Sequence, residues 1–172
     1  MKPIHVFSNT KDYLPILNGA IAAELAILSI LFYTPYFQSE YLKEWYETYQ
    51  LSAVIADVLI LIIGLIIARF IFSYFKLSWN IYKFIGVVLG VQIIHDFLFY
   101  LFFTNVPRGK NKMLDLFKDY AEESDYRAIL GDSFMILLTV LFSLYFANIS
   151  FNENIIYLIV NIYFIPYLIH TR

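Results

Sequence analysis

Five runs of apolar residues, separated by short polar connectors, follow one another along the chain. They cover residues 14–36, 51–75, 81–104, 129–147 and 155–169. A helix needs about 17–25 apolar residues to cross a bilayer, and the first four runs meet that length. The fifth run is shorter, so it either crosses with the help of flanking aromatic rings or enters one leaflet only. We therefore expect an all-α integral membrane bundle with four long transmembrane helices and a shorter fifth, forming a single membrane domain over residues 1–172.

Two of the connectors have the pattern of amphipathic helices. In the connector 38–50, Tyr41, Trp45 and Tyr49 recur every four residues, which places their rings on one helical face. In the connector 111–126, charged residues surround an apolar face that consists of Met113, Leu116, Phe117 and Tyr120. This pattern predicts a helix at the membrane interface, or one that caps the bundle. We expect it to cover one end of the spans.

The composition agrees with a polytopic membrane protein. Hydrophobic residues make up 60% of the chain and charged residues 15%, whereas a soluble domain has about 45–50% and about 25%. Aromatic residues reach 20% and gather near the ends of the runs, as in interfacial belts. The net charge is only −2, and no basic stretch indicates nucleic acid as a partner. The absence of Cys excludes disulfides, thiolate catalysis and Cys-ligated metal sites.

Six polar residues within the apolar runs are the candidate functional residues: Glu24, Asp57, Gln92, His95, Asp96 and Asp132. A charge at the bilayer centre costs roughly 3 kcal/mol, so such residues usually face a partner or water. If the spans alternate in direction, Asp57, Asp96 and Asp132 lie in the bilayer half that faces the connector 111–126. We therefore predict that these three carboxylates approach one another inside the bundle, with Glu24 beside them.

Their chemistry allows three roles. Carboxylates and one imidazole can bind a divalent cation, relay protons, or pair with other polar groups to fix the bundle. Neighbouring residues on a helix point about 100 degrees apart. Gln92 and Asp96 therefore share a face, and His95 is expected to point elsewhere. The sequence does not decide whether a metal or a cofactor binds. Within it, the signatures of zinc proteases, di-iron bundles and serine hydrolases do not occur.

Small residues predict where helices cross closely. The first run carries a face of such residues, namely Gly19, Ala22, Ala23, Ala26 and Ser29. The third run contains a Gly-x-x-x-Gly pattern at Gly86 and Gly90, which also favours a close crossing. Arg69 lies near the end of the second run, where its long side chain is expected to extend toward water.

Four segments resemble small multi-pass membrane proteins encoded by large nucleocytoplasmic DNA viruses. They are residues 92–100 (Gln-Ile-Ile-His-Asp-Phe-Leu-Phe-Tyr), Pro107-x-Gly109, 113–123 (Met-Leu-Asp-Leu-Phe-Lys-Asp-Tyr-Ala-Glu-Glu) and 128–133 (Ala-Ile-Leu-Gly-Asp-Ser). The resemblance covers about the C-terminal half and implies a virion internal membrane or a host endomembrane. It implies no catalytic residue.

From these observations we expect a structural or assembly component of a membrane rather than an enzyme, although the sequence leaves enzymatic activity undecided. Its partners would be the lipid bilayer, copies of itself, and capsid or other membrane proteins. The alternative is a small proton or cation transporter or channel that uses the intramembrane carboxylates. A second alternative is a lipid-directed membrane enzyme.

Overall fold

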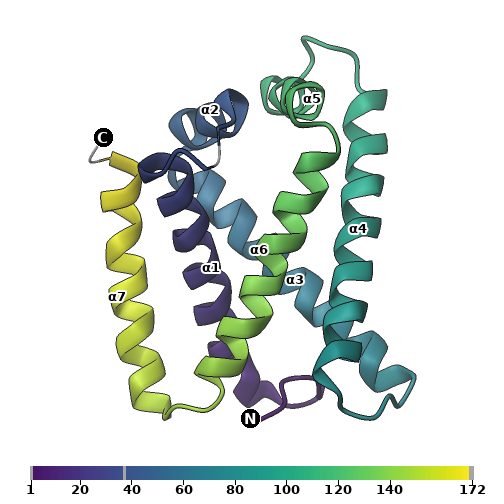
Figure 1. Cartoon of the computed structure of the whole chain (residues 1–172), viewed down its shortest axis with the longest axis vertical. Coiled ribbons are helices and arrows are strands. Elements are labelled where there is room, and N and C mark those ends of the chain that lie inside the picture. The colour runs from purple at the N-terminus through teal and green to yellow at the C-terminus, as the bar shows by residue number, and fades with distance from the viewer. Residues whose placement is uncertain (1, 37, 171–172) are drawn as a thin grey trace.

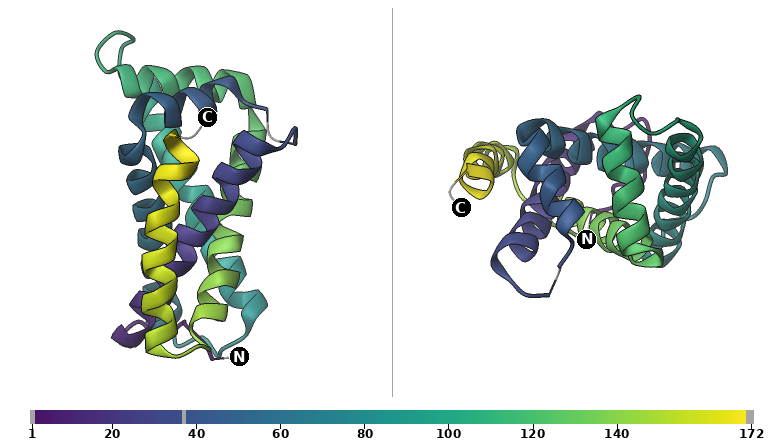
Figure 2. Two further views of the ribbon diagram at one scale, coloured as in Figure 1. Left: turned by 90° about the vertical axis from the view of Figure 1, so that its left-hand side faces the viewer. Right: turned by 90° about the horizontal axis from the view of Figure 1, so that it is seen from above.

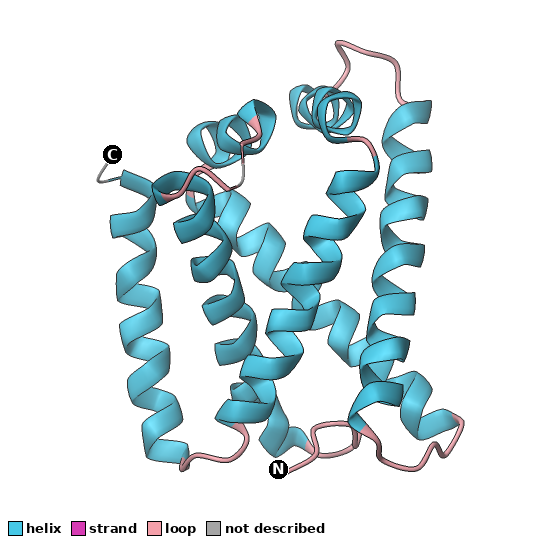
Figure 3. Cartoon of the chain, viewed as in Figure 1, coloured by secondary structure: helices cyan, strands magenta, loops and turns pink. Residues whose placement is uncertain are grey.

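The computed structural model describes residues 2–36 and 38–170, and within these ranges all regular structure is helical (Figures 1 and 3). A short 3-10 helix, Thr10–Asp12, precedes the first long helix. The helices are α1 (Tyr13–Tyr33), α2 (Glu40–Tyr49), α3 (Leu51–Tyr74), α4 (Ile81–Asn105), α5 (Lys112–Ser124), α6 (Tyr126–Phe146) and α7 (Phe151–His170).

Five of these helices are long and apolar enough to cross a membrane, namely α1, α3, α4, α6 and α7. They run alternately up and down, while α2 and α5 lie across one end of the bundle (Figures 1 and 2). We call this the capped end. The N-terminal segment lies at the opposite end (Figure 1). The predicted all-α fold with several membrane-spanning helices is confirmed, and the chain is an integral membrane protein.

The fifth helix is longer than the sequence pattern predicted. α7 begins at Phe151 rather than near residue 155 and contains 20 residues. A reciprocal cap explains the early start, because the Ser150 amide donates to Glu153 Oε2 at 2.7 Å and the Glu153 amide donates to Ser150 Oγ at 3.2 Å. The polar first turn also packs inward, where Asn154 accepts a 2.9 Å hydrogen bond from Asn18 of α1. At this length α7 is long and apolar enough to cross a membrane, which favours a full span over one that enters a single leaflet.

α1 lies at the centre of the bundle and α4 at its edge. In α1, 61% of the apolar stretch is buried, compared with 17% in α4. The predicted small-residue face of α1 is real, because Gly19 lies directly against α6. A Cβ atom there would come within 2.7 Å of the Ser143 amide nitrogen and 2.9 Å of the Thr139 carbonyl oxygen. The prediction for α4 is wrong, because a Cβ atom on Gly86 or Gly90 would meet nothing within 4 Å.

The uncapped end is closed by the N-terminal segment and Arg69. Instead of reaching water, the Arg69 side chain is fully buried and pairs with Asp12 at 3.2 Å. Its Nη2 atom also donates to the carbonyl oxygens of Val6 and Asn9. The segment before α1 folds back over the end of α3, so that its own backbone supplies these acceptors. The expectation of an outward-reaching Arg69 is therefore wrong.

Both predicted amphipathic helices form, and they pack against each other at the capped end (Figure 2). Asn111 caps α5 by accepting from the amides of Met113 and Leu114. Ser39 caps α2 in the same way, and its hydroxyl donates to the Glu123 carboxylate of α5. Because Glu123 also accepts from the Glu40 amide at 2.9 Å, one carboxylate holds the start of α2 against α5.

Candidate functional site

A cavity of about 1270 Å³ lies beneath α2 and α5, between α3, α4 and α6. Its walls are mostly apolar and contain many aromatic rings, including Trp45, Phe99, Phe103 and Phe117. The ring centroids of Trp45 and Phe117 lie 4.9 Å apart, so the two amphipathic helices meet through aromatic side chains over this space. The cavity is therefore located in the bilayer half next to the capped end.

Three aspartates from three different helices line this cavity. Asp57 belongs to α3, Asp96 to α4 and Asp132 to α6. The carboxyl group of Asp132 is close enough to those of Asp96 and Asp57 to interact electrostatically with both. Within the described residues, however, no three His, Asp or Glu side chains lie close enough to hold one metal ion. The aspartates share a chamber, but they do not converge on one point.

Gln92 and His95 both accompany Asp96 on the cavity wall. Gln92 Nε2 donates to Asp96 Oδ1 at 2.7 Å, which agrees with the shared helical face that the spacing predicted. His95 was expected to point elsewhere, but its Nδ1 lies 3.2 Å from the same Asp96 oxygen. The imidazole also stacks on Phe99, one helical turn further along α4, with ring centroids 6.0 Å apart. The expected separation of His95 from Asp96 is therefore wrong.

Asp57 is held by two side chains of α2. The Trp45 indole nitrogen donates to Asp57 Oδ2 at 3.1 Å, and the Tyr46 hydroxyl donates to the same oxygen at 2.9 Å. Burial, reinforced by the carboxyl groups of Asp57 and Glu24, raises the pKa of the Tyr46 hydroxyl well above its ordinary value. Tyr46 therefore stays protonated near neutral pH and acts as a donor to Asp57.

Glu24 lies outside the cavity lining but is connected to it through Tyr46. Its side chain, in the middle of α1, is fully buried. The Tyr46 hydroxyl lies beside the carboxyl groups of both Glu24 and Asp57. The Tyr46 hydroxyl donates to Asp57, whereas neither Glu24 oxygen has a hydrogen-bond partner among the described residues. Glu24 was expected next to the aspartates, but in the structure it lies behind Tyr46 and does not reach the cavity wall.

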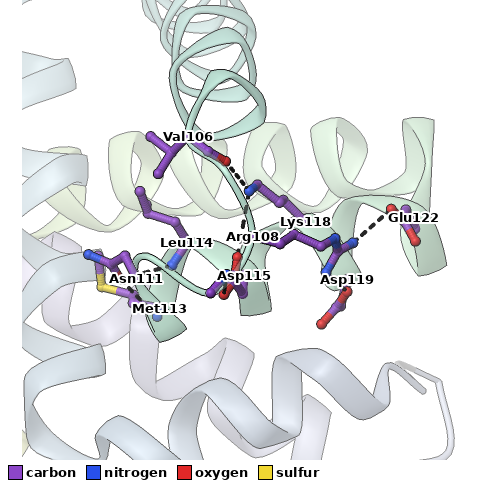
Figure 4. A network of polar contacts seen from close by, with 10 residues as sticks. Val106, Arg108, Asn111, Met113, Leu114, Asp115, Lys118, Asp119 and Glu122 are labelled. Atoms are coloured by element: carbon purple, nitrogen blue, oxygen red, sulfur yellow. Dashed lines mark hydrogen bonds and ion pairs between the residues drawn. The ribbon is translucent and has the colours of Figure 1, made fainter.

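Two basic side chains at the cavity rim are already paired elsewhere. Arg108 binds Asp119 at 2.6 Å and Glu122 at 2.9 Å (Figure 4). Lys118 donates to the Val106 carbonyl oxygen and lies 3.6 Å from Asp115 (Figure 4). Among the described residues, no Lys or Arg forms an ion pair with Asp57, Asp96 or Asp132. The carboxyl groups of the cavity wall are therefore not neutralised by Lys or Arg, and His95 is the basic side chain that contacts one of them.

Sequence patterns missed the contribution of the connectors to this site. Trp45 and Tyr46 of α2, and Tyr120 of α5, all line the cavity. Burial and the neighbouring Asp132 carboxyl raise the pKa of the Tyr120 hydroxyl, so it too remains protonated near neutral pH. The sequence did contain a pattern that indicates this contribution. Both connectors concentrate Tyr, Trp and Phe on one face next to carboxylate-bearing spans.

Comparison with protein-family models, curated proteins and solved structures finds no match to this chain. No family assignment follows, and the resemblance to membrane proteins of large DNA viruses stays a prediction.

Proposed function

We propose that this chain is a small membrane transporter or channel for cations, and that the aspartate-lined cavity is its binding chamber. The observation that carries the proposal is the placement of Asp57, Asp96 and Asp132 around one cavity, where among the described residues no Lys or Arg pairs with them and His95 alone contacts Asp96. Ionisable residues inside a membrane usually mark a substrate or ion path. Carboxylates that face a shared chamber attract positive charge, because their mutual repulsion falls when a cation lies between them.

Protons are a natural second participant in this proposal. Glu24, in the buried middle of α1, lies beside Tyr46, and Tyr46 is hydrogen-bonded to Asp57 on the cavity wall. Rotation of the unpartnered Glu24 carboxyl group onto the Tyr46 hydroxyl would complete a proton path, because the phenol could then accept a proton from Glu24 as it donates its own to Asp57. A cation that enters beside Asp57 would favour release of protons from these side chains. Cation movement coupled to protons is therefore the form of transport that the geometry supports best.

Removal of one cavity carboxylate is expected to lower the flux by about tenfold or more, because a desolvated cation loses a charged partner. The purified chain is reconstituted into liposomes, and the uptake of sodium, rubidium, protons and tetraphenylphosphonium is measured. The intact chain should increase the flux of at least one of these ions above that of protein-free liposomes. Asp96→Asn and Asp132→Asn should each reduce that flux while leaving helix content unchanged.

Glu44→Gln is the matched control. Glu44 lies on α2 at the same end of the bundle, but its side chain is exposed to the surroundings and does not line the cavity. This variant loses the same charge and should keep the full flux. The proposal fails if no ion moves faster than in protein-free liposomes, or if the two cavity variants transport as well as Glu44→Gln.

The structural or assembly role stays a second proposal, supported by the broad apolar surface of α4 and α7. Such a surface suits lipid contact and also self-association. A viral internal membrane or a host endomembrane remains the location that the sequence resemblance implies. A lipid-directed enzyme remains the least supported alternative, since its only support is the amphipathic character of the cavity.

A further inference from the structure

We infer that the cavity binds an organic cation with a hydrophobic body, rather than a bare inorganic ion. This inference rests on the proposed cation-handling function and narrows its substrate class. It follows from three features of the same chamber, which are its volume, its lining and the spacing of its carboxylates.

The volume is larger than a bare ion needs and exceeds the usual range of small-molecule sites. Pockets for small organic molecules measure about 300–1,000 Å³, and this cavity measures about 1270 Å³. A dehydrated metal ion would occupy only a small part of that space. The chamber therefore has room for a molecule with several carbon atoms or rings.

The lining offers an apolar surface for such a body. Trp45 is almost fully buried, and its indole is fixed in place by the hydrogen bond to Asp57. Phe99 and Phe117 pack edge to face, with centroids 5.2 Å apart, and continue this aromatic wall from α4 to α5. Aromatic faces attract organic cations through the ring quadrupole and also bury hydrocarbon. Both properties favour a ligand that carries a positive charge on a hydrophobic body.

The carboxylates are placed to balance charge rather than to coordinate a metal. Divalent cations require several oxygen or nitrogen ligands at about 2.0–2.6 Å from one point. The described His, Asp and Glu residues provide no such group of three. Asp57, Asp96 and Asp132 instead surround the chamber from three helices, close enough to interact electrostatically. A diffuse positive charge on an organic molecule fits this arrangement.

Tetraphenylphosphonium binding to the whole chain tests the inference, with Trp45 as the reporter. The chain has two Trp residues, and Trp79 lies at the opposite end, stacked on His5 at 4.9 Å. Trp79→Phe therefore leaves the cavity indole as the sole Trp and keeps an aromatic ring at position 79. In nanodiscs of zwitterionic lipid, tetraphenylphosphonium should change Trp45 fluorescence in a saturable manner. Empty nanodiscs show only non-saturable partitioning.

Two matched comparisons separate charge recognition from hydrophobic partitioning. Tetraphenylborate has nearly the same shape and the opposite charge, so it should neither bind saturably nor displace tetraphenylphosphonium. In the Trp79→Phe background, Asp96→Asn and Asp132→Asn should each weaken binding by about tenfold, whereas Glu44→Gln should not. Binding is compared only between variants of equal thermal stability. Binding to the Trp79→Phe parent tests the inference even if one variant folds poorly.

The outcomes distinguish this inference from the proposed function. Saturable, aspartate-dependent binding of tetraphenylphosphonium supports it, with or without measurable transport. Equal binding of tetraphenylborate, or no saturable binding of either ion, overturns it. Sodium, rubidium or proton flux that depends on the aspartates without tetraphenylphosphonium binding would overturn this inference alone. The absence of both flux and binding would overturn both proposals.

Discussion

Replacing Gly19 with alanine is expected to lower the free energy of unfolding by about 3 kcal/mol or more, because the added methyl group overlaps the backbone of α6. The new Cβ atom would lie 2.2 Å from Ser143 Oγ, and it would also lie 2.7 Å from the Ser143 amide nitrogen. The hydroxyl could rotate away, but the amide nitrogen belongs to a helix and cannot. The contact between α1 and α6 must therefore open. Unfolding by sodium dodecyl sulfate in mixed micelles measures the change.

Gly86→Ala provides the control for this prediction. Gly86 is also a helical glycine, but a Cβ atom there meets nothing within 4 Å. Alanine favours helix by up to about 1 kcal/mol relative to glycine, so this variant should be as stable as the parent or slightly more stable. If Gly19→Ala and Gly86→Ala behaved alike, the close crossing of α1 and α6 would be contradicted.

Asp12→Ala is expected to destabilise the bundle by about 3 kcal/mol, because it leaves the buried Arg69 without its counter-ion. Both side chains are fully buried, and their charged atoms lie 3.2 Å apart. The Arg69 guanidinium would retain only the carbonyl oxygens of Val6 and Asn9 as acceptors from Nη2. The same unfolding titration in mixed micelles gives the change in stability.

The double variant Asp12→Ala with Arg69→Met tests the reason for that loss. Removal of both charges should restore much of the stability, because methionine fills the apolar space and no buried charge remains. Lys11→Ala, next to Asp12 but exposed, should have little effect. A double variant that is less stable than Asp12→Ala alone would show that the ion pair is not what holds this end together.

The sequence predicts the fold well because long apolar runs permit few structures inside a bilayer. The helices over 51–74 and 81–105 lie within about two residues of the predicted spans, since their ends coincide with changes in polarity. The length of α7 was underestimated because Asn152, Glu153 and Asn154 interrupt the apolar pattern. The Ser150 and Glu153 cap, and the partner that Asn18 provides for Asn154, bring these polar residues into the helix.

The sequence allows the carboxylates of the candidate site to be predicted, but not the side chains that contact them. Depth and helical facing suffice to predict that Asp57, Asp96 and Asp132 turn toward one space. Nothing in the local sequence shows that Trp45 and Tyr46 reach across to Asp57, because that contact depends on how α2 folds over the bundle end. The same holds for Arg69, whose acceptors come from residues about 60 positions away in the chain. The periodicity of a sequence does not predict contacts between residues so far apart in the chain.

The most direct test of the central claim is a cross-link between positions 96 and 132. The chain contains no Cys, so Asp96→Cys with Asp132→Cys offers a short bifunctional maleimide only these two thiols. If both side chains face one cavity, mass spectrometry should show a single linker bridging them within one chain. A control pair uses Leu98→Cys, whose side chain is exposed on the outer surface of α4, together with Asp132→Cys, and it should not be bridged. Two separate linkers on the 96 and 132 thiols, or bridging equal to that of the control pair, would contradict the shared chamber.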